Sequence, residues 1–120
     1  MDPYRTSRKA QLSINDLAFV GAGGKVAAIH RRTGKIAWSQ TVSDGGAFVS
    51  ILLDGDALFV GARGHLWCLD PLNGGQRWIN ELKGFGYGNV AIATARVASD
   101  QNAAIAAHEA AAAAAAATSG

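Results

Sequence analysis

Hydrophobic and polar residues alternate in short runs through most of residues 11–94, which is the pattern of strands with one buried face. Gly, Asn and Asp interrupt the alternation at short intervals, and these residues favour tight turns. The pattern predicts strands at residues 11–16, 17–20, 25–29, 35–41, 49–53, 58–60, 65–69, 76–82 and 89–94. We therefore expect an all-β protein.

The predicted strands before residue 83 fall into two units that repeat one sequence pattern. Residues 19–38 read FVGAGGKVAAIHRRTGKIAW, and residues 59–78 read FVGARGHLWCLDPLNGGQRW. The residues shared by both copies are Phe19/Phe59, Val20/Val60, Gly21/Gly61, Ala22/Ala62, Gly24/Gly64, Gly34/Gly74 and Trp38/Trp78. A four-stranded meander that repeats about every forty residues is typical of a β-propeller blade.

This repeat predicts the organisation of the chain. We expect two four-stranded antiparallel blades, at about 11–42 and 49–82, within a repeat domain of residues 11–96. The strand predicted at 89–94 would be the first of a third unit that does not continue. The architecture is thus an incomplete β-propeller.

The second half of each copy resembles the pyrroloquinoline-quinone-type propeller repeat of quinoprotein alcohol dehydrogenase-like proteins. That repeat usually reads Ala-Leu-Asp, two variable residues, Thr-Gly-Lys, two variable residues and Trp. Residues 28–38, AIHRRTGKIAW, depart from it at His30, which stands at the usual Asp position. Residues 68–78, CLDPLNGGQRW, depart at Cys68, Asn73 and Gly75. The chain is also similar to short two-repeat proteins with an Ala-rich tail.

The resemblance implies structural roles for the shared residues. Trp38 and Trp78 would each dock one blade onto the next, and burying such a side chain stabilises by about 2–4 kcal/mol. The carboxylate of Asp70 would accept hydrogen bonds from turn amides. The repeat glycines would permit tight turns and close packing, and they are Gly21, Gly61, Gly34 and Gly74.

The resemblance also implies self-association. Propellers of this type usually have six to eight blades, so two units cannot close a ring. Exposed sheet edges pair readily with other chains, and we expect a homo-oligomer that forms through the blade edges. The alternative is a small open stack whose ends are covered by the N-terminal arm and the Ala-rich tail.

A glycine-rich segment with two aromatic residues is the first candidate for partner contact. Residues 83–88 read KGFGYG, and we assign possible partner contact to Phe85 and Tyr87, together with Trp67. The alternative for Phe85 and Tyr87 is an inter-blade connection whose aromatic side chains fill the core. For Trp67, a core position in its strand is the favoured interpretation.

No catalytic, cofactor-binding or metal-binding residue is assigned. In a quinone-dependent enzyme, Trp67 could stack on the quinone, and Asp54, Asp56 or Asp70 could act as an acid. Core packing explains the tryptophan better, and turn formation explains the aspartates better. The histidines, His30, His65 and His108, do not have the spacing of a zinc site. Cys68, the lone cysteine, is expected to be a small buried hydrophobe.

Composition limits the partners and the location. The formal net charge is +2, and the basic clusters at residues 5–9 and 31–35 are too small for a nucleic-acid surface. There is no signal peptide and no membrane-spanning segment in the sequence, which predicts a cytoplasmic protein without a membrane partner. Residues 1–10 read as an arm. Residues 99–120 form an Ala-rich tail, for which we predict a helix, with low-complexity disorder as the alternative.

The sequence thus favours a non-catalytic scaffold or binding module that self-associates and needs no cofactor. The alternative is an incomplete or split portion of a quinone-dependent dehydrogenase that is active only in a larger assembly. A third interpretation is a cofactor-free relative of the propeller lipoprotein that serves outer-membrane barrel assembly. The lack of a signal peptide disfavours this third interpretation.

Overall fold

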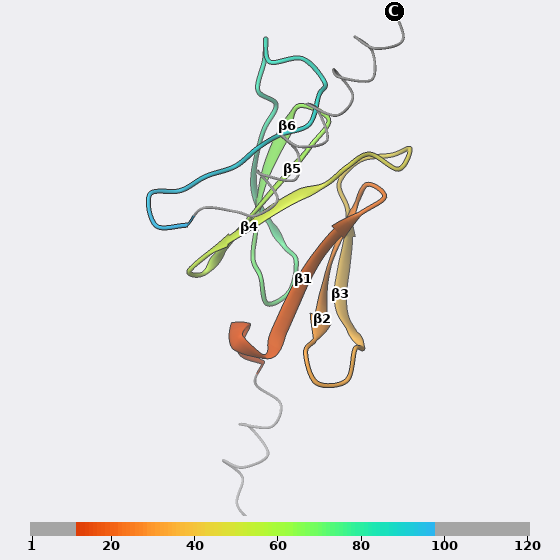
Figure 1. Cartoon of the computed structure of the whole chain (residues 1–120), viewed down its shortest axis with the longest axis vertical. Coiled ribbons are helices and arrows are strands. Elements are labelled where there is room, and N and C mark those ends of the chain that lie inside the picture. Colours follow the sequence, from red (N-terminus) through yellow and green to blue (C-terminus); the bar gives the residue numbers. More distant parts are fainter. Residues whose placement is uncertain (1–11, 98–120) are drawn as a thin grey trace, which may run out of the picture.

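The computed structural model describes residues 12–97, which fold into two antiparallel sheets (Figure 1). The first sheet has the strand order β1-β2-β3, and the second has the order β4-β5-β6-β7. The elements are η1 (Ile14–Asp16), β1 (Leu17–Ala22), β2 (Lys25–His30), β3 (Ile36–Thr41), β4 (Ser50–Asp54), β5 (Ala57–Ala62), β6 (His65–Leu69) and β7 (Gln76–Asn80). The expected all-β fold of two open units is confirmed. The predicted arm at 1–10 and the tail at 99–120 lie outside the described residues.

The two sheets share one register, as the sequence repeat requires. In the first sheet, Phe19 pairs with Ala28, which pairs with Trp38 on β3. In the second sheet, Phe59 pairs with Cys68, which pairs with Trp78 on β7. Because directly opposite residues point to the same side of a sheet, each row of three forms part of one face.

The strand predicted at residues 11–16 does not form in the part of the chain that the structure describes. Residues 14–16 instead make the 3-10 turn η1, so the first sheet has three strands and not four. Ser13 caps this turn: its Oγ accepts a hydrogen bond from the Asn15 amide, and its own amide donates to the Asp16 carboxylate. Such local side-chain bonds compete with strand pairing.

The connection that follows each sheet takes the same path in both units. It returns over the hairpin that contains Gly24 (β1–β2) in the first unit and Gly64 (β5–β6) in the second. In the first unit the Gly24 amide donates to the carbonyl oxygen of Ala47 over 2.9 Å. In the second unit the Gly64 amide donates to the carbonyl oxygen of Gly88 over 3.0 Å. Residues 89–94 therefore begin a third unit as β4 begins the second.

The valines that follow these connections pack against glycines of the preceding sheet. A Cβ added at Gly21 would lie 2.9 Å from Cγ1 of Val49. A Cβ added at Gly61 would lie 2.6 Å from Cβ of Val90. Only glycine allows the next unit to come this close.

Residues 89–94 are not a regular strand, contrary to prediction. Only Ala93 makes a β-bridge within this segment. The first strand of a sheet forms its backbone hydrogen bonds with the second strand, as β4 does with β5. Here the chain turns back after Thr94, whose amide donates to the carbonyl oxygen of Val97, so no second strand follows within the described residues.

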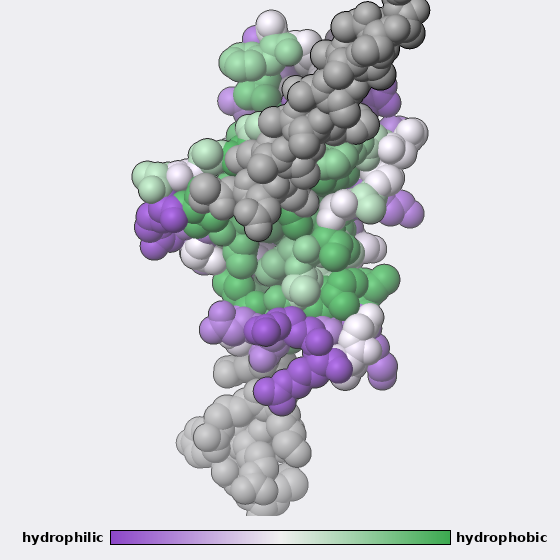
Figure 2. All heavy atoms as spheres, viewed as in Figure 1, coloured by the Kyte–Doolittle hydropathy of each residue, from purple (hydrophilic) through white to green (hydrophobic). Residues whose placement is uncertain are grey.

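The core lies between the two sheets and comes mostly from the second one. Its buried cluster consists of Val26, Val49, Leu58, Val60, Ala62, Trp67 and Leu69. Phe19 and Trp38 of the first sheet pack against this cluster. On the face drawn in Figure 2, hydrophobic residues cover the middle, and hydrophilic residues gather near η1 and the β2–β3 turn. Within residues 12–97, no helix is long and apolar enough to cross a membrane.

Candidate functional site

The two sheets are joined by the indole of Trp38, which reaches from β3 onto the turn between β6 and β7. Its Nε1 donates a hydrogen bond to the carbonyl oxygen of Pro71 over 2.8 Å. Its ring lies against Gly74, where an added Cβ would stand 2.4 Å from the ring carbon Cε3. Gln40 also donates from Nε2 to the carbonyl oxygen of Gly74 over 3.1 Å. A glycine at this position is therefore what lets the indole dock.

Internal hydrogen bonds hold this turn, which we call the receiving turn, in shape. The Gly74 amide donates to the carbonyl oxygen of Asp70 over 2.7 Å, and the Asp70 amide donates to that of Gly75 over 2.8 Å. The Asp70 carboxylate accepts a further bond from the Leu72 amide over 2.8 Å. The indole thus meets a preformed surface, and docking requires little ordering of the turn.

The turn between β2 and β3 has the same backbone bonds as the receiving turn. The Gly34 amide donates to the carbonyl oxygen of His30 over 2.8 Å, and the His30 amide donates to that of Lys35 over 2.8 Å. Gly34 has φ +77°, and Gly74 has φ +74°. Within the described residues nothing lies within 4 Å of a Cβ added at Gly34. This turn is therefore open where the receiving turn carries Trp38.

A second docking face lies on the outer side of the second sheet. Phe59, Cys68 and Trp78 form it, and we call this row the open docking face. The ring of Phe59 backs Trp78 at 6.1 Å between centroids, as Phe19 backs Trp38 at 6.4 Å. Trp78 is 44% exposed, and none of residues 12–97 is hydrogen-bonded to its indole nitrogen. The chain thus contains two faces of the same build, and among the described residues a turn covers the tryptophan of the first face only.

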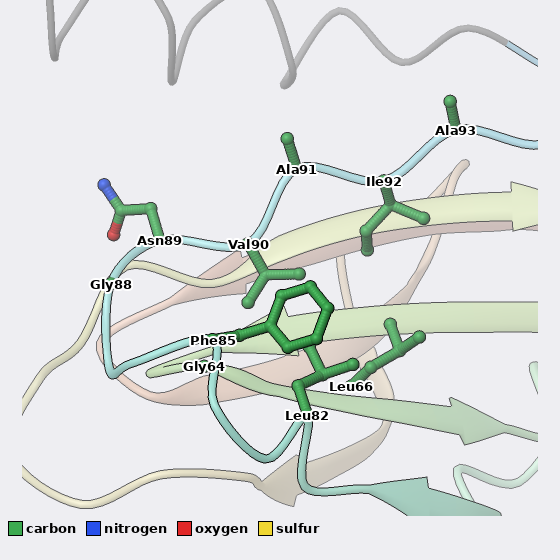
Figure 3. A pocket seen from close by; sticks show the side chains of 10 residues that line it. All are labelled: Gly64, Leu66, Leu82, Phe85, Gly88, Asn89, Val90, Ala91, Ile92 and Ala93. Atoms are coloured by element: carbon green, nitrogen blue, oxygen red, sulfur yellow. The ribbon is translucent and has the colours of Figure 1, made fainter.

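A shallow apolar hollow lies between the second sheet and the segment that follows it (Figure 3). Its volume is about 370 Å³, and its lining residues are Gly64, Leu66, Leu82, Phe85, Gly88, Asn89, Val90, Ala91, Ile92 and Ala93. Figure 3 shows Val90 and Ile92 pointing toward the sheet, whereas Ala91 and Ala93 point away from it. Residues 89–93 therefore present alternate side chains to the sheet, as a first strand would.

The aromatic residues expected to contact a partner are placed differently from one another. Phe85 is 77% exposed and Tyr87 is 81% exposed, so these two do not fill the core. Trp67 is 8% exposed and belongs to the buried cluster, where its ring lies 5.7 Å from that of His65. Little of Trp67 is left for a partner, whereas Phe85 and Tyr87 have open surface.

Asp54 ties the last described residues to the end of β4. Its carboxylate forms a hydrogen-bonded ion pair with Arg96. The hydrogen bond from Arg96 holds the pKa of Asp54 below its usual value of 3.8, partial burial opposes this shift, and the Thr94 side chain adds to it. Residues 89–97 are thus held to the second sheet by this ion pair as well as by the packing of Val90 on Gly61.

Two of the aspartates weighed for quinone chemistry, Asp54 and Asp70, have structural partners in the fold. Asp54 pairs with Arg96, and Asp70 is part of the receiving turn, where Arg77 approaches it at 3.7 Å. Cys68 is buried and unpaired, as expected. Across residues 12–97 no three His, Cys, Asp or Glu side chains gather as a metal site would require.

Comparison with known proteins identifies the repeat. A protein-family model described as outer membrane protein assembly factor BamB, of the PQQ-like repeat type, matches residues 22–120. The matched region contains both docking tryptophans and both turns. The resemblance inferred from the sequence is thereby confirmed. A search of curated proteins gave no significant match.

The two glycine turns provide a matched test of docking within the chain. Gly74→Ala and Gly34→Ala place a side chain on nearly the same left-handed backbone, so both carry a similar conformational cost of about 1–2 kcal/mol. Only at Gly74 does the new Cβ meet the ring of Trp38. We expect Gly74→Ala to lower the free energy of unfolding in urea by about 1–3 kcal/mol more than Gly34→Ala does. Equal losses, measured on dilute protein, would contradict the docking role.

The ion pair at Asp54 predicts a specific pH dependence. Because the folded-state pKa is lowered, the ion pair stabilises the fold above the unfolded-state pKa, and this contribution is lost as pH falls through the folded-state value. We expect the midpoint of Asp54 titration, followed by carboxyl-carbon NMR, to lie below 3.8 and to rise toward 3.8 in Arg96→Gln. The same midpoint in both proteins would show that Arg96 does not cause the shift.

Proposed function

Since the chain belongs to the PQQ-like propeller-repeat family described as outer membrane protein assembly factor BamB, we propose that it is a non-catalytic scaffold that binds proteins, its own copies included. The open docking face carries this proposal. Phe59, Cys68 and Trp78 repeat the build of the face that already binds one folded unit through Trp38. Trp78 of this face is 44% exposed, so the face is suited to binding another propeller-type unit through its tryptophan.

Three further observations support binding over catalysis. Aromatic residues at an exposed face are typical of the centre of protein interfaces. Phe85 and Tyr87 extend the exposed aromatic surface next to the apolar hollow. The family description itself names an assembly factor. The third interpretation of the sequence, a relative of the propeller lipoprotein of barrel assembly, is the one closest to that description.

The proposal includes no nucleic-acid, membrane or cofactor partner. The weak net charge of +2 supports a protein partner over a nucleic acid. The cytoplasmic location stays a prediction, and cell fractionation tests it. The split quinone-dependent dehydrogenase remains the competing hypothesis. If that hypothesis holds, pyrroloquinoline quinone with Ca²⁺ raises the melting temperature, because a ligand that binds only the folded state stabilises it.

Self-association is the directly testable part of the proposal. We expect the mass of the full chain, measured by multi-angle light scattering, to rise above the monomer value of 12.3 kDa as the concentration increases from about 1 to 200 µM, since isolated interfaces of modest size bind in this range. Trp78→Ala should hold the mass at the monomer value. Ile79→Ala serves as the control, because this residue is as exposed as Trp78 on the same strand but lies opposite Trp67, on the other face of the sheet.

Two outcomes would count against the proposal. A wild-type chain that stays monomeric over the whole concentration range refutes self-association. A rise in mass that Trp78→Ala does not affect shows that the copies meet elsewhere. Far-UV circular dichroism of each variant confirms that the sheets are still formed.

A further inference from the structure

The contact between Trp38 and Gly74 has two halves, a tryptophan face and a glycine turn. The described structure leaves one further example of each half uncovered. The open docking face ends in Trp78, which lacks a turn to cover. The β2–β3 turn, with Gly34 at its centre, lacks an indole above it. In the chain itself these two halves meet once, as Trp38 on Gly74. Trp78 lies on the face of the second sheet that points away from the first sheet, which carries the Gly34 turn, so one copy cannot dock them as it docks the first pair.

We propose that copies of this chain associate head to tail, with Trp78 of one copy docked on the Gly34 turn of the next. This inference rests on the proposed self-association and specifies its geometry. The contact repeats the one between the two units within the chain, so it continues an existing interface in the same direction. Such a contact is heterologous, and it generates rings or open chains and not two-fold dimers.

The equivalent hydrogen bond follows from the forty-residue repeat. Arg31 stands where Pro71 stands in the receiving turn, and its backbone carbonyl is the expected acceptor for Nε1 of Trp78. The hydrogen bond from Gln40 to the Gly74 carbonyl oxygen has no direct counterpart between copies. Asn80 stands where Gln40 stands, but it has a shorter side chain, and its Oδ1 accepts from the Leu82 amide over 2.8 Å. The contact between copies therefore relies mainly on Trp78.

The outer face of the first sheet has the residues needed to receive the open docking face. Within the chain, Phe19 and Trp38 pack on the cluster that contains Leu58, Val60, Trp67 and Leu69. The corresponding positions of the first sheet are Ala18, Val20, Ala27 and Ile29. These residues are apolar, and they are exposed or only partly buried, with Val20 at 46%. The next copy thus offers an apolar surface of the same pattern, built from smaller side chains.

Head-to-tail docking also gives residues 89–94 a place in a sheet. The first sheet has three strands, and β1 lies at its edge. The second sheet has four, because β4 pairs with β5. Residues 89–94 occupy the position of β4 relative to the preceding unit. In the register of β4 and β5, Leu53 pairs with Leu58, which would place Thr94 of one copy opposite Ala18 of the next.

Mixing two association-defective variants tests the direction of the contact. Trp78→Ala keeps the open turn but lacks the indole, and Gly34→Ala keeps the indole but blocks the turn. We expect each variant alone to remain near 12.3 kDa and an equimolar mixture to give a complex of twice that mass. The complex stops at two chains because its remaining ends are both defective. Light scattering on the mixture gives the result.

The control variant is Gly23→Ala, which separates blocking of the turn from backbone strain. Gly23 is also left-handed, with φ +60°, and an added Cβ there meets nothing within 4 Å among the described residues. We expect Gly23→Ala to associate as the wild type does. If Gly34→Ala associates as well, while Trp78→Ala does not, the head-to-tail geometry is wrong although the proposed self-association stands. If the wild type itself is monomeric, both fail.

Disulfide trapping tests the strand pairing in a Cys68→Ala background, which places in the second repeat the alanine of the first. Ala18→Cys and Thr94→Cys are mixed and oxidised gently. Directly opposite residues in neighbouring strands have Cβ atoms about 4.5–5.5 Å apart, close enough for a disulfide after small adjustment. We expect a cross-linked dimer. Ala91→Cys replaces Thr94→Cys as the control, since it lies about 10 Å away along the strand. Equal cross-linking of both would refute this register.

Discussion

Close packing of the Trp38 indole on the backbone of Gly74 is the interaction on which the arrangement of the two sheets depends. The ring approaches a position where any Cβ would stand 2.4 Å from Cε3, and its one polar atom is satisfied by the carbonyl oxygen of Pro71. The indole is partly buried, and because its N–H is paired, its covered part gains apolar contact with little loss of hydrogen bonding. On the side of the receiving turn, the core between the sheets is therefore held by Trp38 with support from the Gln40 side chain.

The other side of the same junction, where the chain enters β4, is held by a second close approach. Val49 packs on Gly21, and the connection before it is anchored by the hydrogen bond between the Gly24 amide and the Ala47 carbonyl oxygen. The junction is thus held at both ends by glycines that admit a neighbour. The second unit repeats the valine contact, with Val90 on Gly61. Among the described residues, no turn covers Trp78 as the receiving turn covers Trp38. Half of a third junction is therefore already in place.

The sequence predicted well those features that depend on residues inside one unit. The strands, the hairpins and the row of Phe, small residue and Trp follow from alternation and from the repeated glycines. The strand expected at 11–16 was wrong, although Ser13 and Asp16 have the spacing of a capping box. The alternation of Leu12 and Ile14 favours a strand, but the side-chain hydrogen bonds of Ser13 and Asp16 to the local backbone favour the turn.

The features that could not be predicted depend on what lies next to a unit. Trp38 and Trp78 occupy the same repeat position, yet one is covered by a turn and the other is 44% exposed. Nothing local distinguishes them, because the cover comes from the unit that follows. The exposure of Phe85 and Tyr87 is equally a result of chain path, since the glycine-rich segment leaves the sheet before it returns at Val90.

The strength of docking differs between the chain and an assembly of chains for a physical reason. Within the chain, the two units are already tethered, so the contact does not have to overcome the loss of translational and rotational freedom. Between copies this loss costs about 4–15 kcal/mol before any contact is counted. The smaller side chains of the first sheet and the shorter Asn80 also contribute less apolar contact and hydrogen bonding between copies. An association built on Trp78 should therefore be reversible, and a partner with the same turn and larger apolar side chains would displace a second copy from the open docking face.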